Sequence, residues 1–380
     1  MIVLRSKPLV SALAAVVIST LLAACGGAGQ QAVSPVMPGA DLRPEAKTRP
    51  LIVEYAKGIP PLSSPAYIAK GSDGAMWFTE VNSSAIGRIN RYGQIKQFSE
   101  GISKQAGPTG IALGPDGNMW FAEQGSEPYY SRGAIGRITT SGTVTEFSKG
   151  LDKFDQPFGI TRGPDGNLWF TMVQHTASLS SIGKIGRITP SGKITVFTKG
   201  ISPGNVPQLI AAGRDGNLWF TENACGAICF GTIGRITPSG VITEFKKGIT
   251  QSTTLWTIIA GPDGNMWFTE LTTPLDPKQR SIVGRITPKG TVTEFSKGFP
   301  AMFGPRGIAV GSDGNFWIGA YNTDGEYARM TPSGKVTVFT FQTNFLKGAP
   351  SYLYDLEMGT NNQIWFTELP SNRVGKLLIR

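Results

Sequence analysis

The 380-residue chain has few residues of the kinds that most often carry chemistry. It has one histidine, His175, and three cysteines, Cys25, Cys225 and Cys229. It contains no Gly-Xaa-Ser-Xaa-Gly elbow and no phosphate-binding glycine loop. After the first 24 residues no stretch keeps an apolar spacing of 3.6 residues, so we expect almost no helix. These absences argue against a helical fold and against the common hydrolase and phosphoryl-transfer sites.

A nine-residue phrase that recurs seven times defines the architecture. It reads SDGAMWFTE at 72–80, PDGNMWFAE at 115–123 and PDGNLWFTM at 164–172. Its tryptophans, 43 to 50 residues apart, are Trp77, Trp120, Trp169, Trp219, Trp267, Trp317 and Trp365. A period of this length is typical of propeller blades.

Each repeat predicts four short antiparallel strands, here called A to D from the channel outwards. In residues 157–199, four β-branched or aromatic runs are separated by Asp-Gly, polar and Pro-Ser-Gly turns. The last repeat ends with a C strand, and the segment Leu51–Gly58 matches the D-strand segment Thr143–Gly150. We therefore predict an all-β, seven-bladed β-propeller over residues 51–380, closed when the strand at 51–58 joins the C-terminal blade.

The first 50 residues predict export and anchoring. Arg5 and Lys7 precede the apolar segment Leu9–Ala24, which is too short for a stable membrane span. Its end, Leu-Ala-Ala-Cys25, resembles the lipobox of bacterial lipoproteins. We expect a lipoprotein signal peptide at 1–24, a lipid on Cys25 and a flexible tether over 25–50, which would place the propeller in the bacterial cell envelope. An ordinary cleaved signal with an incidental cysteine is the alternative.

The formal net charge of +10 does not by itself indicate a nucleic-acid partner. Thirteen of the 36 basic residues belong to the repeat and are distributed around the ring rather than gathered on one face. No nucleic-acid motif is present, so we predict a solvated outer surface, a monomer, and membrane contact only through the anchor.

The two remaining cysteines lie in the sequence ACGAIC, between the B and C strands of the fourth blade. Cys225 and Cys229 are expected to form a disulfide, as nearby cysteines outside the cytosol usually do. A metal site would need more ligands, and no His or Asp adjoins them.

One position, eleven residues before each repeat tryptophan, varies from blade to blade and is expected to face the channel mouth. Its occupants are Ala66, Thr109, Phe158, Gln208, Trp256, Arg306 and Tyr354. The residues expected to bind a ligand are Trp256, Phe158, Arg306, Tyr354, Gln208 and Tyr67, as an aromatic platform with one charge. A hydrophobic plug built on Trp256 is the alternative. Long B–C loops are expected to wall this mouth at Gln124–Ala134, Val173–Lys184, Asn223–Thr232 and Leu271–Ile282.

The end of strand B supplies a second set of residues that we expect to face the mouth. These are Glu80, Glu123, Glu222, Glu270 and Glu368. Several carboxylates around one channel, Glu222 and Glu270 first, would suit a divalent cation. Alternatively, each glutamate caps a loop or pairs with a neighbouring Lys or Arg.

The repeat phrases GPDGNMWFTE (261–270), IGRITPSG (185–192) and VTEFSKG (292–298) resemble the virginiamycin B lyase, or streptogramin lyase, family of seven-bladed propellers. The resemblance implies opening of a cyclic depsipeptide by elimination, with a histidine base in a Pro-His-Gly-Ile pattern and a Mg²⁺ ion near glutamate. Here the matching segments are Pro-Thr109-Gly-Ile, Pro-Phe158-Gly-Ile and Pro-Arg306-Gly-Ile, without histidine. His175 lies in a B–C loop, where it is either a substitute base or a solvated side chain.

The sequence therefore favours a lipid-anchored propeller that binds a peptide, glycan or small cyclic ligand at its mouth. The alternative is a divergent Mg²⁺-dependent carbon–oxygen lyase acting through Glu270, Glu222 or His175. A third possibility is an interaction scaffold that uses the outer blade faces.

Overall fold

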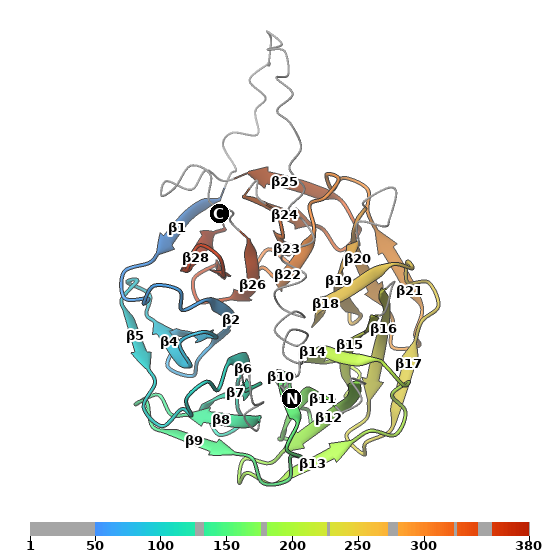
Figure 1. The fold of residues 1–380 in the computed structure, drawn as a ribbon. Coiled ribbons are helices and arrows are strands. Elements are labelled where there is room, and N and C mark those ends of the chain that lie inside the picture. The colour runs from blue at the N-terminus through green and yellow to red at the C-terminus, as the bar shows by residue number, and fades with distance from the viewer. Residues whose placement is uncertain are drawn as a thin grey trace, which may run out of the picture.

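Seven four-stranded antiparallel sheets form a closed ring in the computed structural model of the chain (Figure 1). The structure describes residues 50–125, 133–175, 181–225, 229–272, 280–322, 325–340 and 352–379. No helix occurs within these ranges. Each sheet is one blade, and its strands run from the inside of the ring outwards. The predicted fold class is confirmed.

The first four blades follow chain order. Blade one contains β2 (Pro65–Lys70), β3 (Met76–Glu80), β4 (Ala85–Ile89) and β5 (Ile95–Phe98). Blade two contains β6 (Pro108–Leu113), β7 (Met119–Glu123), β8 (Ala134–Ile138) and β9 (Val144–Phe147). Blade three contains β10 (Asp155–Arg162), β11 (Leu168–His175), β12 (Ser181–Ile188) and β13 (Ile194–Phe197). Blade four contains β14 (Val206–Ala212), β15 (Leu218–Cys225), β16 (Cys229–Ile236) and β17 (Ile242–Phe245).

The last three blades complete the ring. Blade five contains β18 (Thr253–Ala260), β19 (Met266–Thr272), β20 (Ser281–Ile286) and β21 (Val292–Phe295). Blade six contains β22 (Pro305–Val310), β23 (Phe316–Ala320), β24 (Glu326–Met330) and β25 (Val336–Thr340). Blade seven contains β26 (Leu353–Met358), β27 (Gln363–Glu368), β28 (Arg373–Leu378) and, as its outer strand, β1 (Leu51–Tyr55).

The two ends of the chain interlock in blade seven. Strand β1 pairs antiparallel with β28, with Leu51 opposite Leu378 and Tyr55 opposite Val374. In Figure 1 the blue β1 lies beside the red β28, and β2 of blade one follows directly. The edge of β28 is thereby covered, as the sequence predicted.

The repeat phrase is explained by contacts around its tryptophan. In blade three the Trp169 indole N–H donates to Asp165 Oδ1 at 3.0 Å, and the Phe197 ring stacks on the indole at 5.4 Å. The Arg187 guanidinium lies 5.3 Å from the same indole and 3.7 Å from Asp165 Oδ2. Within one repeat, the tryptophan ring, the aspartate carboxylate and the arginine guanidinium contact one another. The repeat arginine thus contacts the tryptophan and aspartate of its own blade.

The glycine of the IGR phrase is required by the phenylalanine of the WF phrase. A Cβ on Gly186 would lie 2.1 Å from Phe170 Cζ, far inside van der Waals contact. The Phe170 ring therefore packs directly over the backbone of strand β12. The corresponding glycines of the other blades, such as Gly136 and Gly234, meet the same ring.

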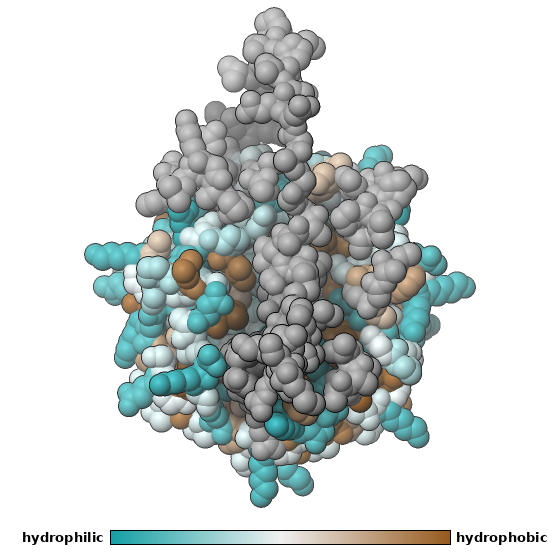
Figure 2. Space-filling model, viewed as in Figure 1, coloured by the Kyte–Doolittle hydropathy of each residue, from teal (hydrophilic) through white to brown (hydrophobic). Residues whose placement is uncertain are grey.

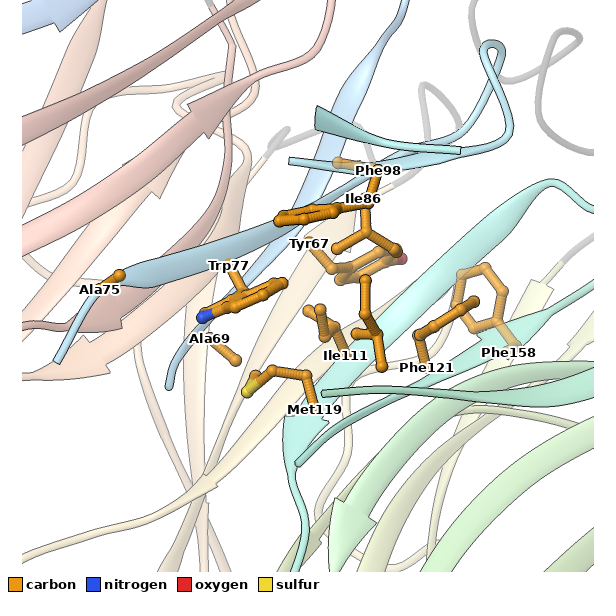
Figure 3. Close-up of a cluster of buried hydrophobic side chains, with 12 residues drawn as sticks. Tyr67, Ala69, Ala75, Trp77, Ile86, Phe98, Ile111, Met119, Phe121 and Phe158 are labelled. Carbon is orange, nitrogen blue, oxygen red and sulfur yellow. The ribbon is translucent and has the colours of Figure 1, made fainter. Parts of the chain in front are cut away.

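The hydrophobic core lies between the blades rather than on the ring axis. Each of seven clusters among the described residues joins the tryptophan of one blade to the apolar face of the next. Figure 3 shows the first such interface, where Trp77 packs with Ile111, Met119 and Phe121. Hydrophilic side chains project around the outer edge in Figure 2. No helix in the described part of the chain has the length and apolarity needed to cross a membrane.

Candidate functional site at the channel mouth

A register shift interrupts every inner strand at the variable position. The shifts fall between Pro157 and Ile160 in blade three, between Leu255 and Ile258 in blade five, and at the equivalent place in the other blades. Such β-bulges re-aim a side chain and are common beside binding sites. The variable residues therefore leave the regular alternation of the strand, which the sequence did not predict.

Arg306 of β22 lies between two aromatic rings from the neighbouring blades. Its guanidinium carbon is 3.9 Å from the centre of the Trp256 ring on β18 and 3.8 Å from that of the Tyr354 ring on β26. Only 7% of Arg306 is exposed. This sandwich is a cation–π arrangement on both faces of the guanidinium.

Tyr67 of β2 extends the aromatic cluster across the ring. It meets the Tyr354 ring edge-on at 5.4 Å and the Phe158 ring of β10 edge-on at 5.7 Å. The Tyr67 and Tyr354 hydroxyl oxygens are 3.5 Å apart. We call Trp256, Arg306, Tyr354, Tyr67 and Phe158 the mouth cluster. Five of the six predicted ligand-binding residues thus come together, from blades one, three, five, six and seven.

Gln208, the sixth predicted residue, makes a different contact. Its side-chain amide donates to the Val206 carbonyl of its own strand at 3.3 Å. It occupies the bulge of β14, but this side-chain hydrogen bond stays within its own strand and does not reach the mouth cluster. Its role in ligand binding stays a prediction.

Three further residues adjoin the cluster that the sequence analysis did not single out. The Tyr321 ring lies 4.9 Å from the Arg306 guanidinium and stacks on Tyr352 at 4.5 Å. Asp355 follows Tyr354 and accepts a hydrogen bond from the Ile68 backbone N–H at 3.0 Å. Position along the chain was the available signal, because Tyr321 directly follows the end of a B strand, Asp355 directly follows the variable residue Tyr354, and Tyr352 precedes Tyr354 by two residues.

Two acidic groups of β26 are held in a poorly solvated part of the channel. Burial raises the pKa of Asp355 to about 7, while the hydrogen bond from Ile68 and the charge of Arg306 oppose that rise. Burial also raises the pKa of Glu357 to about 8, with a further contribution from Asp355. Both groups titrate near neutral pH.

The glutamates that end strand B in blades one, two, four and five interact with the outer strand of their own blade instead of facing the mouth, so that expectation is wrong for these four. Glu222 is fully buried and interacts with Glu244 of β17, the outer strand of its blade. Burial first, and then the Glu244 charge, raises the pKa of Glu222 to about 9. The same causes raise the pKa of Glu270 beside Glu294 well above its usual value. Glu222 and Glu270 therefore interact outward, across strand C, with a carboxylate of the outer strand, and burial and that neighbouring charge raise the pKa of both.

This outward pairing is matched blade by blade. Glu123 pairs with Glu146, and its pKa rises to about 9 for the same reasons. In blade one the partner of Glu80 is the amide of Gln97, which donates at 2.7 Å. Where the inner residue is Met172, it shares an apolar cluster with Val196 of the outer strand. In these blades the outer-strand partner is a carboxylate, an amide or an apolar residue rather than Lys or Arg. Glu80 also accepts a hydrogen bond from the Ser83 hydroxyl of the following loop at 3.0 Å, as the loop-capping alternative predicted.

The carboxyls of Glu222 and Glu270 are poorly placed for a magnesium ion at the mouth. Mg²⁺ usually keeps several waters in its coordination shell, whereas these carboxyls are fully buried and interact with Glu244 and Glu294 of the outer strands. No group of three or more His, Cys, Asp or Glu side chains placed to hold a metal occurs among the described residues.

The predicted B–C loops of blades three and four are largely strand. Strands β11 and β12 continue to His175 and Ser181, which lie opposite each other in register. His175 is half-buried, and its Nδ1 lies 3.4 Å from the Ser181 hydroxyl oxygen. The only histidine therefore sits at the end of an extended hairpin.

The cysteines fall partly outside the described residues. Cys229 is disulfide-bonded, and Cys225 is its register partner across β15 and β16. The Cys225 side chain is outside the described part, as are Cys25, the predicted signal peptide and the tether up to residue 49.

Comparison with known proteins gives a consistent result. The virginiamycin B lyase family model matches residues 51–154, 128–232 and 229–380. A solved structure described as a streptogramin B lyase is 27% identical with a TM-score of 0.71, covering 87% of this chain and 98% of that one. Virginiamycin B lyase from Staphylococcus aureus is 29% identical with a TM-score of 0.70, covering 87% and 99%.

A second structure of the Staphylococcus aureus enzyme bears on the chemistry. It is a catalytically inactive His-to-Ala variant solved with quinupristin, and it is 29% identical with a TM-score of 0.70, covering 87% of this chain and 100% of that one. A search of the curated proteins gave no match.

Proposed function

The chain belongs to the virginiamycin B lyase family, and from this premise we propose that its mouth binds a peptide, glycan or small cyclic ligand without cleaving it. The observation that carries the proposal is the mouth cluster, in which Arg306 is held between Trp256 and Tyr354. Aromatic faces and one fixed charge converge there from five blades. Such convergence of ring faces and a polar anchor is typical of ligand sites.

The composition of the mouth argues against the elimination reaction. Elimination needs a base that removes a proton near neutral pH. None of the seven variable positions holds histidine, and an arginine stays protonated in proteins and cannot act as a base. The inactive variant of the Staphylococcus aureus enzyme lacks a histidine, which supports the importance of this difference.

A divergent Mg²⁺-dependent carbon–oxygen lyase is the competing function, because the family includes lyases by name. It would have to act through Glu270, Glu222 or His175. The two glutamates are buried and interact with the outer strands of their blades, and His175 lies at a hairpin end in blade three. These placements favour binding over this alternative.

Quinupristin is the probe that tests the proposal, since a relative was solved with it. Its binding to the full propeller would be measured by isothermal titration calorimetry, together with a panel of linear peptides and oligosaccharides. The proposal predicts saturable binding of at least one probe, lost in Trp256→Ala and kept when the exposed Tyr92 on the outer edge becomes Ala. Loss in the Tyr92 variant alone would instead indicate a scaffold that uses blade faces.

We also propose that the propeller is exported and held at the membrane by a lipid on Cys25. The support is the sequence Leu-Ala-Ala-Cys25 after an apolar segment. Labelling of cells with a radioactive fatty acid should mark the wild-type protein and not Cys25→Ala. Equal labelling of both proteins would refute the anchor.

A further inference from the structure

Arg306 is a buried cation with no ion-pair partner among the residues that the structure describes. Two arginines are 7% exposed, Arg306 and Arg373. Arg373 Nη1 lies 3.6 Å from Glu54 Oε1. Arg306, by contrast, makes no ion pair and no side-chain hydrogen bond with any described residue. The acid beside it, Asp355, has its Oδ2 on the Ile68 N–H instead. Burying a charge costs free energy unless the charge is paired. The position of Arg306 is therefore suited to a ligand that supplies the counter-ion.

A second donor in the mouth cluster also lacks an acceptor. The Trp256 Nε1–H is buried and has no hydrogen-bond partner among the described residues. Six repeat tryptophans, in contrast, donate to the aspartate of their own repeat, as Trp169 does to Asp165. Two orphan donors, one charged and one neutral, thus belong to side chains that stack on each other.

The geometry of the sandwich determines what Arg306 can bind. Rings cover both faces of the guanidinium, at 3.9 and 3.8 Å from its central carbon. The Tyr321 ring lies farther away, at 4.9 Å, and the guanidinium retains N–H donors in its plane that have no acceptor among the described residues. Carboxylates and phosphates fit the edge of a guanidinium with two hydrogen bonds.

We propose that the mouth recognises the oxyanion of an organic ligand, through the guanidinium edge of Arg306, while the aromatic rings contact the rest of the ligand. This inference rests on the proposed ligand-binding function and names the chemical class of its ligand. The rings of Tyr67 and Phe158 extend the aromatic cluster beyond Tyr354, so an aromatic acid is a suitable probe.

Three aromatic probes test the inference by calorimetry, and the first two differ only in their polar end. They are N-acetyl-phenylalanine, its neutral amide and phenyl phosphate. Wild-type protein should bind at least one of the two anions about tenfold or more tighter than the amide, as charge-assisted hydrogen bonds do. The better anion identifies the class of oxyanion. Arg306→Met should remove this preference, and Arg187→Met, at a repeat arginine, should keep it.

A stability measurement shows whether the variants are folded and tests the missing counter-ion. Without ligand, Arg306→Met should keep or raise the melting temperature, since it removes an unpaired buried charge. Arg373→Met should lower it, because Glu54 would lose its partner.

Equal affinity for acid and amide overturns the inference and leaves the ligand-binding proposal intact if quinupristin or another neutral probe binds. Absence of all binding overturns both, and a large drop in melting temperature for Arg306→Met contradicts the inference.

Discussion

Trp256 differs from the seven repeat tryptophans in what its indole contacts. It is half-buried and faces Arg306, whereas Trp169 is fully buried between blades. Trp256→Ala should weaken ligand binding about tenfold, the scale of a cation–π contact of roughly 1–2 kcal/mol. Trp169→Ala should instead lower the free energy of unfolding by about 3–5 kcal/mol. Calorimetric titration and urea unfolding of both variants measure the contrast, and equal destabilisation would favour a plug.

Glu222 makes the stability of the propeller depend on pH. Its pKa rises from 4.5 to about 9 on folding because of burial and the Glu244 charge. The stabilisation tied to its bound proton is therefore full below pH 4.5 and is lost progressively as pH rises towards 9. Glu222→Gln should flatten this loss, since an amide can donate to Glu244 as Gln97 donates to Glu80 in blade one.

Urea unfolding at pH 5, 7 and 9 measures this slope. The exposed Glu100→Gln serves as the control, because it removes the same kind of group from solvent. An unchanged slope in Glu222→Gln would show that Glu222 is ionised in the folded protein.

Asp355 should make anion binding at the mouth pH-dependent. The groups around it are Arg306 from β22, Tyr67 from β2, and Tyr354 and Glu357 from its own strand. Burial raises the pKa of Asp355 to about 7, so rising pH adds a negative charge beside Arg306. Affinity for N-acetyl-phenylalanine should fall between pH 6 and 8, and Asp355→Asn should reduce that fall. Titrations at the two pH values that give equal affinities for the wild type would contradict this.

At the scale of single residues, the sequence predicted which residues form the mouth cluster, but it did not predict where the glutamate side chains point. Variation at one repeat position identified Trp256, Arg306 and Tyr354, because binding surfaces vary where a frame is constant. The direction of Glu222 was not predictable, since it depends on a partner on the outer strand and on how a side chain crosses strand C.

At the scale of the element, the close contact between the phenylalanine ring of the WF phrase and the backbone of strand C can be tested. A Cβ on Gly186 would lie 2.1 Å from the Phe170 ring. Gly186→Ala should therefore lower the free energy of unfolding by about 1–3 kcal/mol through overpacking. The exposed Lys193→Ala on the following turn should change it by less than about 0.5 kcal/mol. Urea unfolding compares them, and an unaffected Gly186 variant would show that the ring moves freely.

The strands themselves were predicted in type and order, but not in their ends. Polar sequence between β11 and β12 predicted a loop over Val173–Lys184, yet pairing continues to His175 and Ser181. Strand pairing with a neighbour overrides the polar composition, because a hairpin satisfies the backbone hydrogen bonds of both arms. The bulges were also missed, since a register shift leaves no mark in composition.

At the scale of the molecule, closure of the ring should govern stability. Tyr55 of β1 stacks on Trp365 at 5.9 Å, and β1 covers the edge of β28. Removal of residues 1–58 should lower the melting temperature strongly and promote aggregation through the exposed edge. Removal of residues 1–49 leaves β1 in place and should not change the melting temperature. Scanning calorimetry with size-exclusion chromatography compares the two proteins, and equal melting temperatures would contradict the role of β1.

The number of blades and the closure followed from the sequence, because a period with a fixed tryptophan is read without knowledge of tertiary contacts. The ligand did not follow, since the mouth is assembled from residues up to 287 positions apart, such as Tyr67 and Tyr354. These residues come together only when the seven blades close into a ring.

The most direct test of the central claim, that the mouth binds without cleaving, is incubation of quinupristin with the protein and Mg²⁺ followed by chromatography with fragment spectra. Fragmentation is needed because elimination opens the ring without changing the mass. The account predicts that quinupristin stays cyclic at all times sampled. Opening of the ring that depends on time, protein and Mg²⁺ would contradict it.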